Sequence, residues 1–284
     1  MATKEELIRI SSQVRRDIIR MVTASQSGHP GGSLGSADVL TALYFHVMKH
    51  DPKTWTRSCK GQDAFILSAG HLAPVLYSVL ARAGYFPVSE LGTLRAFGSR
   101  LQGHPSVEKG LPGIVQASGS LGQGLSCAAG IALGKRLDSE DNFVYVHCGD
   151  GESEEGQIWE AAMWADHEKL DNLIASTDWN GQQIDGPTEQ VAGIENLEGK
   201  WKAFGWNVLV ADGHDFDAIL AAYAAAKANR GSGKPTMILF RSVMGRGVDF
   251  MAGTHKWHGK APSVQQCEEA LSQLEETLGD YQEE

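Results

Sequence analysis

Two oxygen-bearing side chains, Asp150 and Asn180, each follow an apolar run with the composition of a buried β-strand. The runs occupy residues 143–146 and 172–175, and the two side chains are about thirty residues apart, which suits one crossover helix. Because parallel strands present their carboxyl ends to a common crevice, we expect both side chains at one site. A carboxylate, an amide oxygen and a loop carbonyl suit Mg²⁺ held together with a phosphate group.

The glycines on either side of Asp150 would let the backbone approach a bulky anion closely. The N–H group of Gly151 is placed to donate a hydrogen bond to a phosphate oxygen. The same triplet, 149–151, is equally typical of a tight turn whose aspartate caps the next helix. The triplet alone therefore leaves a ligand site and a structural turn both open.

Four of the ten histidines lie in glycine-rich segments: His29, His71, His104 and His258. Imidazoles can stabilise sugar hydroxyls, a developing alkoxide or phosphate oxygens near neutral pH. His71 follows the apolar run 64–67 and opens a predicted helix, where the first N–H groups favour a phosphate. An isolated histidine there would more commonly cap or pack, and the parallel with Asp150 favours the binding role. The sequence shows no Ser/His/Asp or thiolate arrangement that would indicate nucleophilic catalysis instead.

Hydrophobic periodicity predicts alternating strands and helices, the pattern of an α/β fold with a doubly wound, mainly parallel sheet and helices on both faces. Strands are predicted at 64–67, 143–146, 172–175, 206–210 and 235–240. Helices are predicted at about 3–21, 36–48, 71–83, 125–137, 158–170, 194–204 and 215–228. The segments 27–32, 99–119 and 245–259 are predicted to be irregular, the first because a proline and three glycines should prevent a helix.

The 284 residues, 30.6 kDa in mass, suffice for one large three-layer domain spanning residues 1–284. Its last part, 263–284, is acidic and is predicted to form a helix that docks on the body or on a partner.

The net charge of −10 argues against a nucleic-acid partner, so phosphate ligands would have to be held by local dipoles and a metal. The four cysteines show neither metal-ligand nor disulfide spacing, which is typical of a reducing cytoplasm. No long apolar span or signal peptide is apparent. We therefore expect a cytoplasmic protein that binds neither nucleic acid nor a membrane.

The GDG triplet at 149–151, followed about thirty residues later by Asn180, is similar to the fingerprint of thiamine diphosphate enzymes. Further segments resemble transketolase specifically and occur in the family's order over most of the chain. They are SGHPGG at 27–32, LSAGH ending at His71, GHP at 103–105, GSLGQGL at 119–125 and THKWHGK at 254–260. The resemblance implies the diphosphate-binding (PP-type) domain of that family, with thiamine diphosphate and Mg²⁺ as cofactors; Ca²⁺ or Mn²⁺ could substitute.

The resemblance also implies roles for individual residues. The cofactor would be contacted by His71, Gly119, Ser120, Leu121, Gly151, Asn180, Ile184 and His258. The metal ligands would be Asp150, Asn180 and the carbonyl of Gln182. The donor ketose would meet His29, His104 and His258. Glu155 and Glu160 match carboxylates that relay protons across the family's dimer contact; without the resemblance they would be solvated charges near a helix start.

A complete transketolase is about twice this length, and the glutamate that activates the cofactor lies in a second domain of a partner chain. The resemblance therefore predicts the N-terminal subunit of a split transketolase. Its expected partner is a C-terminal subunit carrying the pyrimidine domain, in an α2β2 heterotetramer. The implied reaction is transfer of a two-carbon ketol unit between sugar phosphates, as in the pentose phosphate pathway.

Two alternatives remain at this point. The chain could be the α-type subunit of another thiamine enzyme, such as a 2-oxo acid dehydrogenase or a deoxyxylulose-phosphate synthase-like enzyme, or a non-catalytic paralogue that binds a partner. One position departs from the family: some members have lysine where this chain has Met244, so a phosphate contact of those members would be missing.

Overall fold

The computed structural model describes residues 1–282, and its centre is a sheet of five parallel strands in the order β1-β2-β3-β7-β6. The strands are β1 (Ala64–Leu67), β2 (Val144–Gly149), β3 (Leu173–Trp179), β6 (Asn207–Asp212) and β7 (Thr236–Arg241). The predicted α/β fold with a mainly parallel sheet is confirmed. All five predicted strands exist, and β2 and β3 extend further toward their carboxyl ends than the apolar runs indicated.

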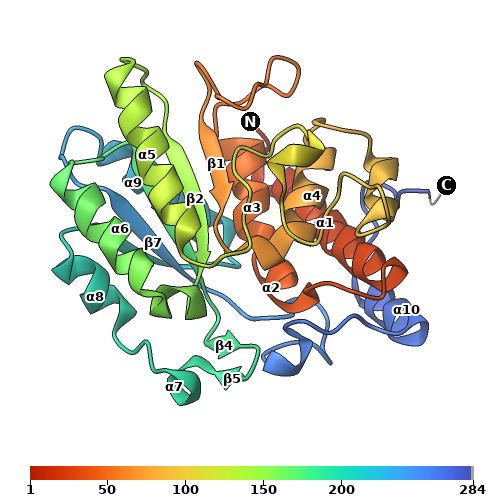
Figure 1. The fold of residues 1–284 in the computed structure, drawn as a ribbon. Helices are drawn as coiled ribbons and strands as arrows, with labels where there is room; N and C mark the ends of the chain where they lie inside the picture. The colour runs from red at the N-terminus through yellow and green to blue at the C-terminus, as the bar shows by residue number, and fades with distance from the viewer. Residues whose placement is uncertain (283–284) are drawn as a thin grey trace.

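Helices cover both faces of this sheet (Figure 1). One face carries α1 (Lys4–Ala24), α2 (Pro30–Gly35), α3 (Ala37–Ala42), α4 (Ala73–Arg82) and α9 (Phe216–Ala228). The other carries α5 (Gln123–Leu137), α6 (Gly156–His167) and α8 (Leu197–Ala203). Because side chains alternate along each strand, the sheet separates two apolar clusters.

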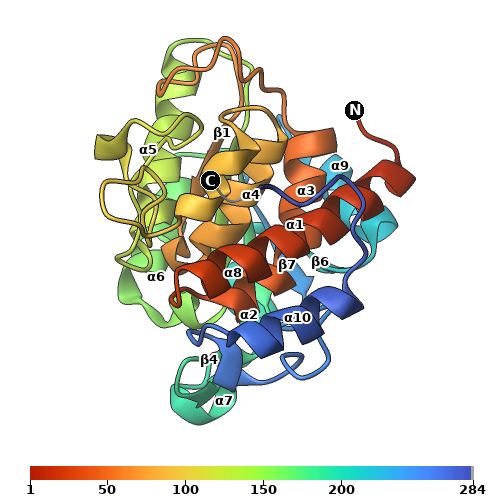
Figure 2. The same ribbon diagram turned by 90° about the vertical axis from the view of Figure 1, so that its right-hand side faces the viewer.

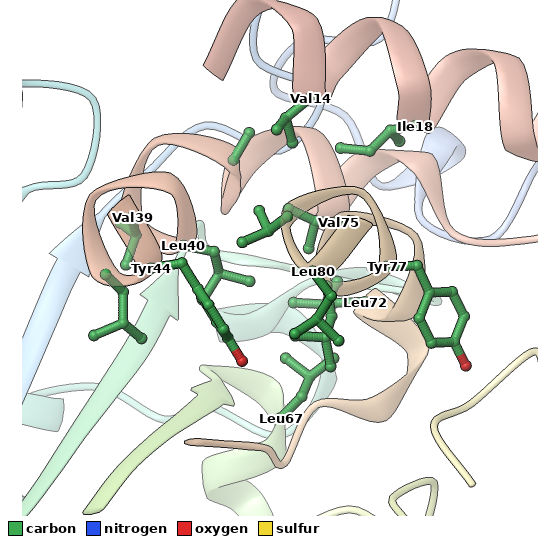
Figure 3. Close-up of a cluster of buried hydrophobic side chains, with 14 of the residues drawn as sticks. Val14, Ile18, Val39, Leu40, Tyr44, Leu67, Leu72, Val75, Tyr77 and Leu80 are labelled. Carbon is green, nitrogen blue, oxygen red and sulfur yellow. The ribbon is translucent and has the colours of Figure 1, made fainter. Parts of the chain in front are cut away.

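The larger apolar cluster fills the space between α1, α3, α4 and the sheet. Figure 3 shows Val14 and Ile18 from α1 pointing toward Leu40 and Val75, with Leu67 of β1 beneath them. At its N-terminus α1 has a capping box, since Thr3 and Glu6 each accept the other's backbone N–H. This packing fixes α2, the short helix that follows α1, against the end of the sheet.

Short elements complete the described chain. They are the β4–β5 hairpin (Gln182–Gln183 and Gly186–Pro187), α7 (Thr188–Val191), α10 (Val264–Gln273), a π-turn at Leu43–Val47 and 3-10 turns at Gly70–Leu72, Val88–Thr93, Val107–Lys109, Gly151–Glu154 and His255–Trp257. In place of the single helix predicted at 36–48, the structure has α3 followed by a π-turn. The helix expected to open at His71 begins instead at Ala73, after a 3-10 turn that contains the histidine.

The prediction that 27–32 cannot be helical is wrong, because α2 begins at Pro30. Proline suits the first turn of a helix, where its missing N–H needs no partner. The glycines serve close packing here: a Cβ on Gly31 would stand 2.7 Å from Cγ of Met244, and one on Gly32 would stand 2.5 Å from Cδ2 of Leu72. His29 is the residue immediately before this helix.

The predicted helix at 263–284 is also too long, since α10 ends at Gln273. The chain then leaves the helix because Arg16 of α1 donates to the carbonyls of Leu271 and Leu274, at 2.9 and 2.7 Å, and pairs with Asp280. Figure 2 shows α10 running beside α1. Residues 283 and 284 lie outside the described part of the chain.

Within residues 1–282, no helix combines the length and the apolar character that crossing a bilayer requires.

Candidate functional site

The carboxyl ends of β1, β2, β3 and β7 open into a cavity of about 420 Å³, a volume typical of small-molecule sites. Twelve of the residues predicted from the sequence line it: His29, His71, His104, Gly119, Leu121, Asp150, Gly151, Glu155, Asn180, Gln182, Ile184 and His258. They come from segments spread over most of the chain, so the fold brings together residues that are far apart in the sequence.

Two predicted residues do not line this cavity. Ser120 is exposed in the loop before α5, and Glu160 lies on the exposed side of α6. Their roles in cofactor binding and in proton relay stay predictions. Glu155 is exposed at the cavity, immediately before α6.

Asp150 and Asn180 line the same cavity, as predicted, and the Asp150 carboxylate bonds the residue that follows Asn180. Asp150 is only 2% exposed, and its Oδ2 accepts from the N–H of Gly181 at 2.6 Å. The N–H of Gly151, expected to donate to a phosphate, donates to Oδ1 of Asp150 at 2.8 Å. Burial, together with the nearby carboxylate of Asp178, raises the pKa of Asp150 to about 7. A buried carboxylate held only by backbone donors is a natural ligand for a cation.

The amide of Asn180 is held in one orientation. Its Nδ2 donates to Oδ2 of Asp178 at 2.7 Å, and its Oδ1 accepts from the N–H of Gln182 at 2.8 Å. A carboxylate can only accept, so this contact assigns the nitrogen and the oxygen of the amide. Within residues 1–282 no group of three or more His, Cys, Asp or Glu residues could hold a metal, so a metal here would rely on amide and carbonyl oxygens.

Sequence reasoning missed Asp178 and Glu152. Asp178 lies near the end of β3, where it is 3% exposed, and a longer strand assignment would have placed it beside Asn180. Glu152 accepts hydrogen bonds from the Ser68 hydroxyl at 2.5 Å and from the N–H groups of Gly122 and Gly149 at 2.7 and 2.9 Å. It therefore ties together the turns that follow β1 and β2 and the loop that precedes α5.

The four imidazoles predicted from glycine-rich segments form one cluster. The ring of His29 lies 5.2 Å from that of His71, 5.5 Å from His258 and 6.4 Å from His104, measured between centroids. His71 and His258 stack at 5.0 Å. The four imidazoles lie on four separate segments, and sequence periodicity does not predict how such segments are placed relative to one another.

These imidazoles are neutral near neutral pH. Burial is the main cause that lowers the pKa of His29 to about 4 and that of His71 to about 3, and the charge of Arg95 contributes at His29. Burial also lowers the pKa values of His104 and His258. The Nδ1 atoms of His29 and His258 are buried without a hydrogen-bond partner in the described chain.

Arg95, which sequence reasoning did not select, lies behind this cluster. Its guanidinium donates to the hydroxyl of Ser27 at 2.9 Å and more weakly to the carbonyl of Gly103 at 3.4 Å. These two residues precede His29 and His104, so one side chain connects the two loops that carry the imidazoles. The residue has a positive φ of 59°, for which arginine gives no sequence signal.

Met244 lines the cavity and is 1% exposed. Its thioether packs on Gly31, and its carbonyl accepts from the N–H of Gly253 at 2.8 Å. This part of the wall is therefore apolar. Ile184, 61% exposed, stands at the cavity on the turn of the β4–β5 hairpin.

Comparison with known proteins gives consistent matches. The family model described as transketolase, thiamine diphosphate binding domain, matches residues 8–279. The chain is 44% identical over 273 residues to the 6-deoxy-6-sulfo-D-fructose transketolase subunit of Clostridium sp. (strain MSTE9), covering 94% of this chain and 97% of that protein. It is 38% identical over 271 residues to an apulose-4-phosphate transketolase subunit of Phocaeicola vulgatus, covering 94% and 93%.

Solved structures agree. The chain superposes on transketolase from Leishmania mexicana with a TM-score of 0.89 and 30% identity, covering all of this chain and 43% of that one. The chain therefore spans less than half the length of this longer relative, whereas it matches the two subunits over nearly their whole length.

Proposed function

Since this chain belongs to the transketolase family, we propose that it is the thiamine diphosphate-binding subunit of a two-chain transketolase. Together with a partner chain it transfers a two-carbon ketol unit from a ketose to an aldose. The observation that carries this proposal is the convergence of Asp150, Asn180 and four imidazoles in one cavity. The family membership disfavours the 2-oxo acid dehydrogenase and deoxyxylulose-phosphate synthase alternatives.

The partner is a second chain that supplies the remaining transketolase domains. Support comes from the two relatives named as subunits, which the chain matches almost from end to end. The whole enzyme would then contain two copies of each chain, an α2β2 heterotetramer. The activating glutamate and most contacts to the acceptor sugar belong to the partner.

The residues of the cavity suit a divalent cation bound to a diphosphate. Asp150 brings one carboxylate, which accepts from the backbone N–H groups of Gly151 and Gly181. Asn180 brings an amide oxygen with a second lone pair, and Gln182 a backbone carbonyl. Hard oxygen donors of this kind select Mg²⁺ together with cofactor phosphates. Ca²⁺ or Mn²⁺ would fit the same donors. His71 and His258 then hold the diphosphate oxygens.

When bound, thiamine diphosphate supplies the carbanion chemistry of ketol transfer. The protein contributes position and hydrogen bonds. His29, His104 and His258 hold the hydroxyl groups of the donor ketose, and as neutral imidazoles each offers one donor and one acceptor.

The donor is proposed to be a ketose with an anionic group at its far end. The two subunit relatives are named for 6-deoxy-6-sulfo-D-fructose, which carries a sulfonate, and for apulose-4-phosphate, which carries a phosphate. Sugar phosphates of the pentose phosphate pathway are one choice within this class, and sulfonated sugars are another.

The test is reconstitution of the chain with its partner, thiamine diphosphate and Mg²⁺. Ketol transfer is measured with fructose 6-phosphate, 6-deoxy-6-sulfo-fructose and apulose 4-phosphate as donors, and Asp150→Ala serves as the inactive control. Activity that requires both chains and Asp150 supports the proposal. Full ketol transfer by the chain alone, or absence of cofactor binding with the partner present, would overturn it.

A further inference from the structure

A row of buried polar side chains lies behind the candidate site, on the α1–α4 side of the sheet. His147 of β2 is completely buried, and Ser176 and Asp178 of β3 lie on the same face because they alternate with Ala175 and Thr177. Nδ1 of His147 lies 2.9 Å from the hydroxyl of Ser176. Polar groups in this position are costly unless each has a hydrogen-bond partner.

Ser36, at the start of α3, connects His147 to Asp178. Its hydroxyl lies 3.2 Å from Nε2 of His147 and is near enough to the carboxylate of Asp178 to interact with it electrostatically. Gly35 precedes Ser36 and lies beside Asp178, since a Cβ at Gly35 would stand in ordinary contact, 3.7 Å, with Oδ1 of Asp178. The chain of contacts therefore runs from Ser176 to the metal-site wall.

The direction of each hydrogen bond follows from chemistry. Both carboxylate oxygens of Asp178 accept hydrogen bonds, from Asn180 and Ser242. We therefore assign the single proton of the Ser36 hydroxyl to this carboxylate, and Ser36 then accepts from Nε2–H of His147. Nδ1 of His147 is then an acceptor for the hydroxyl of Ser176. Both ring nitrogens are used by one neutral tautomer. In agreement, burial lowers the pKa of His147 to about 4.

The other end of this chain is Asn180. Its Nδ2 donates to Oδ2 of Asp178, while the hydroxyl of Ser242 holds Oδ1 of the same carboxylate. With its nitrogen fixed there, the amide of Asn180 presents its oxygen to the cavity. Rotation of Asp178 would release the amide and allow the wrong atom to face a cation.

We propose that His147 is a positioning residue for the metal ligand Asn180, acting through Ser36 and Asp178. It touches neither the cavity nor a ligand; it holds the Ser36 hydroxyl so that the carboxylate and the amide keep one orientation. Partners behind a metal ligand commonly change metal affinity 10- to 100-fold when they are removed. The metal role of Asn180 rests on the proposed function, whereas its fixed orientation does not.

The first measurement uses the ligand-free chain and NMR. The side-chain amide hydrogens of Asn180, assigned with an Asn180→Ala variant, should exchange with water at least about tenfold faster in His147→Leu than in the unmodified chain. His147→Gln keeps an N–H donor for Ser36 and should restore slow exchange. Ser36→Ala, which removes the link itself, should behave like His147→Leu and serves if that variant does not fold.

The second measurement uses the enzyme reconstituted with partner and thiamine diphosphate, with Mn²⁺ as the probe. Affinity should fall about tenfold in His147→Leu and recover in His147→Gln. Val146→Ala is the matched control. Val146 is adjacent to His147 in β2, and its side chain packs in the apolar cluster on the opposite face of the sheet, so the substitution should destabilise the chain without touching His147. Exchange and affinity equal to those of Val146→Ala would overturn the proposal.

Failure of the proposed function would look different. If the unmodified enzyme binds no Mn²⁺ with thiamine diphosphate, while amide exchange still depends on His147, the positioning of Asn180 stands and the metal role falls.

Discussion

The guanidinium of Arg95 lies against the backbone of Gly103, where an added Cβ would stand 2.7 Å from Cζ of the arginine. The same group donates to the hydroxyl of Ser27. One cation thus holds two loops together and lies close to both His29 and His104, whose pKa values its charge lowers.

Replacing this cation should raise two pKa values at once. In Arg95→Met, the pKa values of His29 and His104 should both increase, because a repelling positive charge is gone. NMR titration of the imidazole carbons measures this. Arg100→Met is the matched control, since Arg100 pairs with Glu90 nearby and should leave both values unchanged. In the reconstituted enzyme, kcat/KM should fall about tenfold as the two loops lose their common anchor.

The low pKa of His29 predicts a pH-dependent cost to folding. Between about pH 4 and 6.5 the unfolded chain binds a proton that the folded chain does not, so this residue lowers stability as pH falls. His29→Asn should therefore gain about 1–2 kcal/mol relative to the unmodified chain when the pH is lowered from 7.5 to 5. Urea unfolding at both pH values measures the gain. His167→Asn, on the exposed side of α6, is the matched control, and an equal change in both variants would contradict the assignment.

Asp150 should cost stability in the absence of ligands. Its pKa of about 7 lies above that of the unfolded chain, so the penalty grows as pH rises from about 4 and is complete above 7. Asp150→Asn should raise the ligand-free Tm at pH 8 by roughly 2–4 °C, as about 1 kcal/mol does in a chain of this size, and by less at pH 5.

The same substitution should abolish the stabilisation produced by Mg²⁺ with thiamine diphosphate, because the carboxylate ligand is lost. Differential scanning fluorimetry of the reconstituted enzyme, with and without both ligands, measures this. Undiminished stabilisation of Asp150→Asn would exclude Asp150 as a metal ligand.

Gly31 should not tolerate a methyl group. In Gly31→Ala the new Cβ would stand 2.7 Å from Cγ of Met244 and 2.8 Å from the carbonyl oxygen of Trp257. We expect a loss of about 1–3 kcal/mol and a displaced His258, since the crowded backbone precedes that imidazole. Chemical denaturation measures the first effect, and the NMR signal of His258 reports the second.

Gly130 provides the control for this prediction. It lies inside α5, and a Cβ there would meet nothing within 4 Å. Gly130→Ala should therefore stabilise the chain by about 0.5–1 kcal/mol through helix propensity. A similar loss in both variants would show that crowding at Met244 is not the cause.

The sequence contained enough to predict the sheet, because its strands are nearly continuous apolar runs bounded by glycine and polar residues. It also contained enough to bring Asp150 to Asn180, since carboxyl ends of neighbouring parallel strands converge. The resemblance to transketolase added the prediction that the four histidines belong to this same site. Their actual clustering depends on loops whose course is decided by tertiary contacts.

The errors have specific physical causes. The glycines of α2 were interpreted as breaking a helix, whereas packing against Leu72 and Met244 requires them within one. Helical periodicity after Ser263 did not reveal that Arg16 would draw the chain away from α10 at Leu274. The partly buried Arg95 and the fully buried His147 were missed because the role of such a polar residue is recognisable only from its partners.

The attachment of residues 271–280 to α1 has a consequence for synthesis. Arg16 bonds the carbonyls of Leu271 and Leu274 and the carboxylate of Asp280. These partners lie 255, 258 and 264 residues after it in the sequence. While the ribosome is still translating the sheet, this guanidinium lacks these partners, although the apolar face of α1 can already pack on α3 and α4. The polar contacts of the first helix can therefore be completed only after residue 280 has been translated.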